Sequence, residues 1–385
     1  MAEERKHAKL SASSSHRWIA CPPSANLCTQ YEDKGSSYAI EGSAAHELCE
    51  HKLKLALGLP TKDPTADLSY YNEEMEEHAN DYAAYILEIM EHERQAGHNP
   101  QIFIEQRVDF SRFVQEGFGT CDVVIISDGT LYVCDFKFGK GVKVEATGNP
   151  QLRIYALGAL EHFGMLYDIR VVSMIVYQPR LDHISDETVF VESLYQWADE
   201  VLKPAAELAY AGEGEFNAGA HCQFCKAKYN CRKRAEENMA LAAYEFAMPA
   251  LLDNDEISEI LLKVDDLVSW AGDVKEFALQ QALKGVKFDG FKVVEGRSNR
   301  RYISEVDVAD TVKEAGYDPY EKSILGITKM ETLLGKKQFA ALLGLLVEKP
   351  QGKPVLVPET DKRQEINVTT ATQVFDEPIA DHYEN

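Results

Sequence analysis

The sequence lacks any run of about 18 apolar residues, which is the length that a membrane-spanning helix needs. Residues 1–9 are polar and lead into a serine-rich stretch, so the apolar core of a secretory signal is missing as well. We therefore expect a cytosolic protein with no membrane partner.

Basic residues are scarce, because 40 Lys and Arg stand against 63 Asp and Glu and give a formal charge of −23. That charge argues against a protein that coats nucleic acid or an anionic membrane. The charge is uneven, however: residues 67–93 contain nine acids and no Lys or Arg, whereas residues 226–234 contain five bases and no acid. Six more bases follow at Lys284, Lys287, Lys292, Arg297, Arg300 and Arg301. Uniform coating is excluded, but a local basic surface is not.

Eight cysteines in 385 residues are too few for a disulfide-stapled secreted scaffold, and clustered thiols in a reducing compartment indicate metal ligands or catalytic groups. Cys222, Cys225 and Cys231 have a C-x2-C-x5-C spacing, which lets three thiolates converge but leaves a tetrahedral site one ligand short. An iron–sulfur cluster, a structural zinc ion and unligated surface thiols are the three interpretations of this spacing.

The fourth ligand must come from elsewhere in the chain. The candidates are one histidine and five cysteines: His221, Cys21, Cys28, Cys49, Cys121 and Cys134. Cys21 is favoured because its Ala-Cys-Pro-Pro context cannot continue a helix and can present the side chain outward. A metal shared by Cys21 and the late cysteines would close a loop of about 200 residues and fasten the two ends of the domain together.

Apolar periodicity predicts the order of elements. The predicted elements are helices at 41–58 and 71–96, strands at 101–108, 122–127 and 131–138, a helix at 150–162, a strand at 169–178 and a helix at 193–211. Asp128-Gly129 is a hairpin signal between the second and third strands, and Asn149-Pro150 is a helix-start signal. We therefore expect an α/β (α+β) fold with a central mixed β-sheet flanked by helices.

Three segments are predicted along the chain. Residues 1–240 hold the strands and the cysteine cluster, and residues 241–345 form a mostly helical accessory region with a hairpin at Val286–Glu295. Residues 346–385 contain four prolines and few periodic apolar residues, which predicts an extended or disordered tail.

Chemistry-bearing residues gather at the end of the third predicted strand, at Asp135-Phe136-Lys137. Side chains i and i+2 of a strand share a face, so the Asp135 carboxylate and the Lys137 ammonium point into one pocket, and the hairpin can bring Asp122 beside them. Two carboxylates and a cation are what Mg²⁺ chemistry on a phosphodiester requires. A structural salt bridge at a strand end is the plainer interpretation.

Other residues fit the same pocket. His46 lies on the first long helix, and Gln151 and Tyr155 share one face of the helix that follows the third strand. Arg107 and Arg153 are nearby cations of undetermined direction. A surface histidine and an ordinary amphipathic face are the plainer interpretations here.

In chain order these motifs resemble the RecB-like branch of the PD-(D/E)XK nucleases. The likeness is greater to its iron–sulfur members, the AddB-type nuclease domain and the CRISPR-associated RecB-like exonuclease. The matching motifs are Cys21-Pro22, Gly42/His46, Gly119/Asp122, Asp135/Lys137, Gln151/Tyr155 and Cys222/Cys225/Cys231. The whole chain also resembles a group of phage and prophage proteins of unassigned function, through residues 10–27, 135–141 and 326–337.

The resemblance implies a restriction-endonuclease-like core closed by an iron–sulfur clasp. By resemblance, Asp122 and Asp135 hold one or two Mg²⁺ or Mn²⁺ ions, with His46 and the Phe136 carbonyl as further ligands and Glu105 as an optional one. Lys137 would position the attacking water, and Gln151 and Tyr155 would orient the active site or the DNA strand. The ligands of a 4Fe-4S cluster, or of a structural zinc, would be Cys21, Cys222, Cys225 and Cys231.

The expected function is a metal-dependent DNA nuclease, an exonuclease that hydrolyses phosphodiester bonds on single strands or at DNA ends. The setting would be phage recombination, repair or replication in a bacterial host cell, with a phage recombinase, single-strand-binding protein or helicase as further partners. The alternative is a catalytically silent DNA- or protein-binding module on the same fold. A nucleotide site at Gly139-Lys140-Gly141 is disfavoured because the P-loop pattern is missing.

Overall fold

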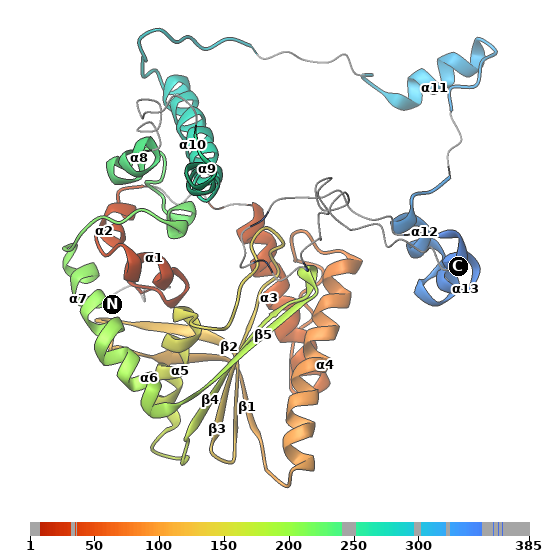
Figure 1. The fold of residues 1–385 in the computed structure, drawn as a ribbon. Helices are drawn as coiled ribbons and strands as arrows, with labels where there is room; N and C mark the ends of the chain where they lie inside the picture. Colours follow the sequence, from red (N-terminus) through yellow and green to blue (C-terminus); the bar gives the residue numbers. More distant parts are fainter. Residues whose placement is uncertain are drawn as a thin grey trace, which may run out of the picture. The chain divides into compact units, whose positions relative to one another are not determined.

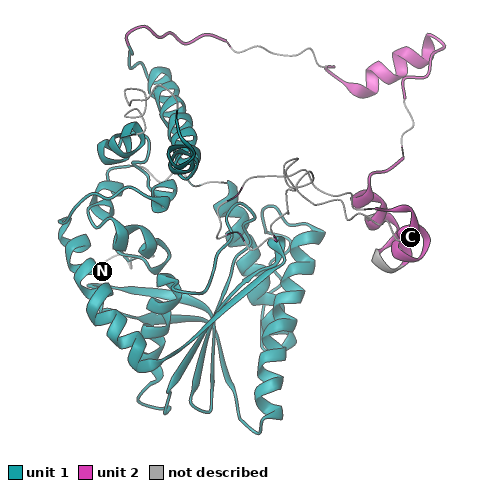
Figure 2. Cartoon of the chain, viewed as in Figure 1, with its two compact units in different colours: residues 1–288 teal, residues 289–385 magenta. Residues whose placement is uncertain are grey.

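The computed structural model describes residues 8–31, 35, 37–240, 252–295, 302–320, 324–348, 357, 361 and 364. The chain divides into two compact units, residues 1–288 and 289–385 (Figure 2). The predicted boundary at 240 falls beside residues 241–251, outside the described residues, and stays a prediction. Most of the predicted tail and the bases Arg297, Arg300 and Arg301 also lie outside the described residues.

The first unit is built on one five-stranded mixed sheet. Its strands are β1 (Gln101–Asp109), β2 (Phe118–Ser127), β3 (Thr130–Phe136), β4 (Val171–Gln178) and β5 (His183–Phe190). They are ordered β1-β2-β3-β4-β5, and β3 and β4 run parallel while the other neighbours are antiparallel. The mixed sheet is therefore confirmed.

Helices cover both faces of this sheet, as Figure 1 shows. The helices of the first unit are α1 (Ser15–Ala20), α2 (Ser24–Cys28), α3 (Ser37–Ala56), α4 (Glu73–Gln95), α5 (Pro150–Phe163), α6 (Val191–Trp197), α7 (Lys203–Ala211), α8 (Arg232–Met239), α9 (Asn254–Leu261) and α10 (Val264–Leu283). A π-helical turn, Ala198–Leu202, joins α6 to α7, and a 3-10 turn, Ala220–Phe224, precedes the last two candidate cysteines.

Two apolar layers hold the helices on the sheet. Val124 and Ile126 of β2 pack with α5, α6 and α7, whereas their neighbours Val123 and Ile125 pack with α3 and α4. This alternation follows from the period of two along a strand and explains why both faces of the central strands are apolar. Asn149 caps α5, because its side chain accepts hydrogen bonds from the N–H groups of Gln151 and Leu152, as the sequence predicts.

Two predictions differ from the structure. β5 was not expected, because its sequence HISDETVF has four consecutive polar residues, two of them acids that are uncommon in strands. The hairpin predicted at Val286–Glu295 is wrong: a turn forms at Asp289-Gly290, where Gly290 has φ +82°, but residues 286–295 form no strand. A hairpin without a third strand or an apolar surface to pack on has little stability of its own.

The second unit is described by itself. Its helices are α11 (Glu305–Glu314), α12 (Ile327–Leu334) and α13 (Lys336–Leu343). Ser304 caps α11 by accepting a hydrogen bond from the Asp307 N–H. Within the described part of the chain, no helix combines the length and the apolar character that crossing a membrane requires.

A buried carboxylate fastens the end of α4 to the sheet. Glu93 accepts hydrogen bonds from Tyr132 Oη at 2.6 Å and Ser127 Oγ at 2.7 Å, and His98 Nδ1 lies 2.7 Å from its Oε2. Burial alone would raise the pKa of Glu93, but these hydrogen bonds lower it below its ordinary 4.5. The hydrogen bond to Glu93 raises the pKa of His98 above its ordinary 6.5.

Glu93→Gln is expected to lower the free energy of unfolding by about 2 kcal/mol, because charge-assisted hydrogen bonds to a buried group are lost. Chemical denaturation monitored by circular dichroism measures this loss. Glu91→Gln is the matched control on the same helix, since the Glu91 side chain is 56% exposed and its change is expected to stay below about 0.5 kcal/mol. Equal losses for the two variants would contradict the role given to Glu93.

The contact between Glu93 and His98 makes the stability of the fold depend on pH. A carboxyl whose pKa is lowered by folding stabilises the fold above its unfolded pKa, so the Glu93 contribution is lost as pH falls below 4.5. A histidine whose pKa is raised by folding stabilises the fold below its unfolded pKa, so the His98 contribution is lost as pH rises beyond 6.5. The stability difference between wild type and Glu93→Gln is therefore expected to be largest between pH 4.5 and 6.5.

Candidate functional site

Two aspartates lie side by side where β2 and β3 meet. Val123 pairs with Cys134 in the antiparallel ladder, and the next register position places Asp122 beside Asp135. Only 4% of the Asp135 surface is exposed. The two carboxylates come from one hairpin, because the Asp128-Gly129 turn joins the strands at their other end.

Asp135, Lys137 and Gln151 form a closed triangle of contacts. Lys137 Nζ lies 2.8 Å from Asp135 Oδ2, Gln151 Nε2 donates to Asp135 Oδ1 at 2.9 Å, and Lys137 Nζ donates to Gln151 Oε1 at 3.2 Å. Asp135 Oδ2 is buried and, apart from the Lys137 ammonium, it has no partner among the described residues. A buried acceptor oxygen thus remains available to another donor or to a cation.

Asp122 is held by a different set of partners. Its Oδ2 accepts the Phe136 N–H at 2.8 Å, and its Oδ1 lies 3.3 Å from His46 Nδ1 of α3. The His46 ring packs edge-on against the Phe136 ring, with centroids 5.5 Å apart. The structure therefore brings His46, Asp122, Asp135 and Lys137 together around the end of β3.

The electrostatics of this cluster follow from burial and mutual charge. Burial raises the pKa of Asp135, and the Asp122 charge raises it further, against the lowering effect of Lys137. Burial would lower the pKa of Lys137, but Asp135 and Asp122 raise it, so the ammonium keeps its proton. Burial would raise the pKa of Asp122, but His46, the Phe136 N–H and Lys137 lower it. Asp122 is thus stabilised as an anion, whereas the net effect on Asp135 disfavours its ionised form.

A small hollow opens beside Asp122 and is lined by His46, Glu50 and Glu105 among others. Burial would lower the pKa of His46, but Asp122 and Asp135 raise it to about 9. Burial and the Asp122 and Glu50 charges raise the pKa of Glu105 to about 7. Glu50 belongs to no motif, although its i+4 spacing from His46 on a helix could have indicated it.

The helix α5 brings Tyr155 close to the strand that carries Asp122. A Cβ at Gly119 would lie 2.9 Å from a ring carbon of Tyr155, so the ring packs directly on the β2 backbone. Burial, then the charge of Asp135, raises the pKa of Tyr155, which therefore stays a neutral phenol. Arg153 turns away from this cluster and binds Glu187 of β5 at 3.0 Å.

The donor set suits a hard divalent cation, although it is not assembled into a site. Carboxylate oxygens of Asp122 and Asp135, one of them buried without a hydrogen bond, are the oxygen ligands that Mg²⁺ and Mn²⁺ prefer. Among the described residues, however, no three His, Cys, Asp or Glu side chains are positioned to hold a metal ion as they stand. Asp122 is engaged by His46 instead, so binding would require side-chain rotation.

The four cysteines predicted to share a centre line one small hollow. Cys21 ends α1, and the other three, Cys222, Cys225 and Cys231, lie in or beside the segment between α7 and α8. Arg17 and His221 line the same hollow. Cys49, Cys121 and Cys134 are instead buried in the apolar layers of the sheet.

A fifth cysteine lies next to this group. Cys28 Sγ of α2 is 3.7 Å from Cys225 Sγ, and both residues are buried. The thiol hydrogen bond to Cys225 lowers the pKa of Cys28 to about 6. The sequence indicates Cys28 only as one of six candidate fourth ligands, and it does not favour Cys28 over the others for a contact with a residue 197 positions away.

Part of the predicted basic surface is neutralised within the fold. Asp273 of α10 binds Lys228 at 2.7 Å and Arg234 at 2.6 Å. These contacts hold α10 against the cysteine segment, so helix residues beyond 240 belong to the same compact unit. Arg232 is exposed on the same segment.

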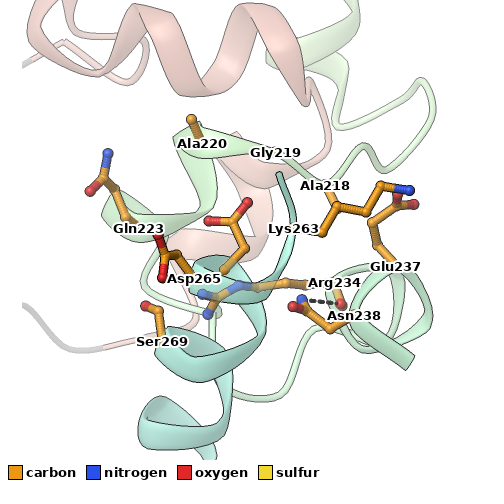
Figure 3. A pocket seen from close by; sticks show the side chains of 11 residues that line it. Ala218, Gly219, Ala220, Gln223, Arg234, Glu237, Asn238, Lys263, Asp265 and Ser269 are labelled. Carbon is orange, nitrogen blue, oxygen red and sulfur yellow. Dashed lines mark hydrogen bonds between the residues drawn. The ribbon is translucent and has the colours of Figure 1, made fainter. Parts of the chain in front are cut away.

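A larger hollow lies between this segment and α10 (Figure 3). The Arg234 side chain reaches across it from α8. The backbone carbonyl oxygen of Arg234 accepts a hydrogen bond from Asn238 Nδ2 at 2.8 Å. The lining carries Glu237, Asp265 and Asp266 beside Arg234 and Lys263, and includes none of the predicted site residues. Its mixed charge does not select a ligand of one sign.

Comparison with known proteins places the chain in a family. The family described as "Protein of unknown function (DUF2800)" matches residues 7–364. The chain belongs to DUF2800. A solved structure described as "Crystal structure of SSO0001" is also similar, with 15% sequence identity over 48% of this chain and 94% of that chain and a TM-score of 0.21. For this DUF2800 member, the candidate site therefore rests on its own residues and their geometry.

Proposed function

We propose that this protein is a metal-dependent DNA nuclease with a RecB-like PD-(D/E)XK site, acting on single strands or DNA ends. The observation that supports it most is the pairing of Asp135 with Lys137 and Gln151, beside Asp122 on the neighbouring strand. A purely structural ion pair does not need a second buried carboxylate next to it, because like charges in a protein interior destabilise one another.

In this proposal Asp122 and Asp135 hold the cation, with His46, Glu105 and the Phe136 carbonyl as further candidate ligands. A bound Mg²⁺ or Mn²⁺ would lower the pKa of a water molecule and stabilise charge on the phosphate. The structural support is the chemistry of the donors and the buried Asp135 Oδ2 that has no hydrogen-bond partner among the described residues.

Lys137 is proposed to orient the attacking water and to stabilise developing negative charge. Its ammonium is kept protonated by Asp135 and Asp122, so it is proposed to act as a hydrogen-bond donor. Gln151 contacts both Lys137 and Asp135 and is proposed to fix their relative orientation. Tyr155, a neutral phenol packed on β2, is proposed to position the Gln151 helix face or the DNA strand.

The cysteines are proposed to bind a 4Fe-4S cluster, with structural zinc as the alternative. Support comes from the hollow that Cys21, Cys222, Cys225 and Cys231 line together. A metal bound there would fasten the two ends of the proposed restriction-endonuclease-like core. The proposed setting is recombination, repair or replication of phage DNA, with a recombinase, single-strand-binding protein or helicase as possible partners.

A catalytically silent binding module is the second candidate. The Asp122–His46 contact favours it, because a carboxylate already paired with a cationic side chain has less need of a metal. The two candidates differ in one measurable property, since only the nuclease shortens DNA when a divalent cation is supplied.

The test is incubation of end-labelled single- and double-stranded DNA with the purified chain and Mn²⁺ or Mg²⁺. Wild type is expected to shorten the DNA, and EDTA and Asp135→Ala are expected to abolish shortening. Asp168→Ala is the matched control, because Asp168 is 76% exposed and pairs with Arg170 at the surface. Equal degradation by wild type and Asp135→Ala would overturn the site, and DNA binding without shortening would favour the silent module.

A further inference from the structure

The segment around α2 is fastened to the cysteine segment by contacts that do not involve thiols. Tyr31 Oη donates to Asn230 Oδ1 at 2.9 Å, and the Tyr31 ring packs edge-on against Tyr229 with centroids 5.8 Å apart. Asn217 Nδ2 donates to the Ala20 carbonyl at 3.0 Å. These contacts hold the two segments together on both sides of Cys28 and Cys225.

This arrangement brings Cys28 and Cys225 together inside an apolar cluster. Their Sγ atoms are 3.7 Å apart, Ala227 is fully buried beside them, and Leu27 and Tyr31 pack around them. Cys28 is 7% exposed and Cys225 is 9% exposed. Cys225 also lines the small hollow that the other candidate ligands share.

We propose that Cys28 and Cys225 are a dithiol that hydrogen peroxide converts into a disulfide, which withdraws Cys225 from metal binding. One thiol is oxidised to a sulfenic acid as peroxide is reduced to water, and the other thiol then displaces a second water and forms the S–S bond. The balance is two thiols and one peroxide giving one disulfide and two waters. The withdrawal of a ligand rests on the proposed metal centre, whereas the pairing itself does not.

A zinc site is the competing interpretation of the same distance. Two thiolates on one tetrahedral zinc lie about 3.8 Å apart at the usual zinc–sulfur distance. Within the described ranges, however, no third His, Cys, Asp or Glu is positioned with these two to complete a metal site. In the metal-free chain the Cys28–Cys225 pair can therefore form a disulfide, whereas a metal bound to Cys225 in the proposed centre would compete with that disulfide.

The test treats the reduced full-length chain with excess hydrogen peroxide, blocks free thiols by alkylation, and identifies linked peptides by mass spectrometry without reduction. Wild type is expected to give a peptide pair that joins Cys28 to Cys225 and that dithiothreitol cleaves. Cys28→Ser is expected to lose this pair and to keep its metal content. Cys134→Ala is the matched control, because Cys134 is equally buried but lies in the sheet, and it is expected to crosslink as wild type does.

Three outcomes would overturn the proposal. The Cys28–Cys225 peptide pair could be missing after peroxide, another pairing among the five cysteines could dominate, or Cys28→Ser could lose its metal before any oxidant is added. A further comparison uses the rate of Cys28–Cys225 disulfide formation in metal-loaded and in metal-free protein. Equal rates would support the disulfide but would show that Cys225 is not a metal ligand. Failure of the dithiol and failure of the metal centre are thus distinguishable.

Discussion

Lys137→Met is expected to reduce cation-dependent DNA hydrolysis by about 10²–10⁴-fold, the range over which positioned proton donors and acceptors act. The variant removes the ammonium 2.8 Å from Asp135 Oδ2. It also leaves a buried carboxylate unpaired, which we expect to cost up to about 3 kcal/mol of folding free energy. This loss of folding free energy is limited because 27% of the Lys137 side chain is exposed, and solvent screens part of the charge interaction. Rates of DNA shortening and urea denaturation measure the two effects.

A double variant separates catalysis from stability. Asp135→Asn combined with Lys137→Met removes both charges, so the folding free energy is expected to recover part of the loss, as coupled charges do in a double-mutant cycle. DNA hydrolysis is expected to stay at the level of the single variant. Lys62→Met is the control, because the Lys62 side chain is 88% exposed. If hydrolysis recovered together with stability, the pair would be structural and the proposed role of Lys137 would be wrong.

Cys222→Ser is expected to have the largest effect on stability. If the cysteines share a metal centre, the variant opens a crosslink between α1 and the segment before α8, across about 200 residues of chain. By analogy with the removal of a native crosslink, we expect a loss on the order of 3 kcal/mol and a fall in thermal midpoint on the order of 10 °C. Iron, sulfide and zinc content, together with differential scanning calorimetry of anaerobically purified protein, measure this prediction.

The control for this prediction is Cys134→Ala, which truncates a buried thiol of the sheet and is expected to keep wild-type metal content. Absorbance near about 400 nm in the wild type would identify an iron–sulfur cluster, since such clusters are held by cysteine thiolates as proposed here. Colourless protein with one zinc per chain would select the alternative. Wild-type protein that binds neither metal, with unchanged stability in Cys222→Ser, would contradict the clasp.

Much of the fold could be predicted from local patterns. β1 to β4 and helices α3, α4 and α5 follow from apolar periodicity, and their starts and turns follow from short-range chemistry such as the Asn149 cap. The juxtaposition of Asp122 with Asp135 follows from one hairpin register. These features depend on residues close together in the chain, where a single sequence carries the information.

Other features depend on distant segments and could not be predicted. The polar strand β5 exists because β4 offers it a ladder, as the pairing of Val171 with Phe190 shows. The Cys28–Cys225 contact and the binding of Lys228 and Arg234 to Asp273 each join positions that share no local pattern. The −23 charge was likewise a poor guide to individual residues, since Glu93 is one of the acids and lies buried against the sheet.

The hairpin of β2 and β3 also bears on the order of events during synthesis. Asp122 and Asp135 are 13 residues apart and meet through a single turn, so the closure entropy of their loop is small. Part of the contact surface of α1 and α2 is made by α7 and the cysteine segment, which leave the ribosome after all five strands of the sheet. We therefore expect the carboxylate pair to assemble while the chain is still growing, and the N-terminal helices to complete their docking only after α7 and the cysteine segment have been synthesised.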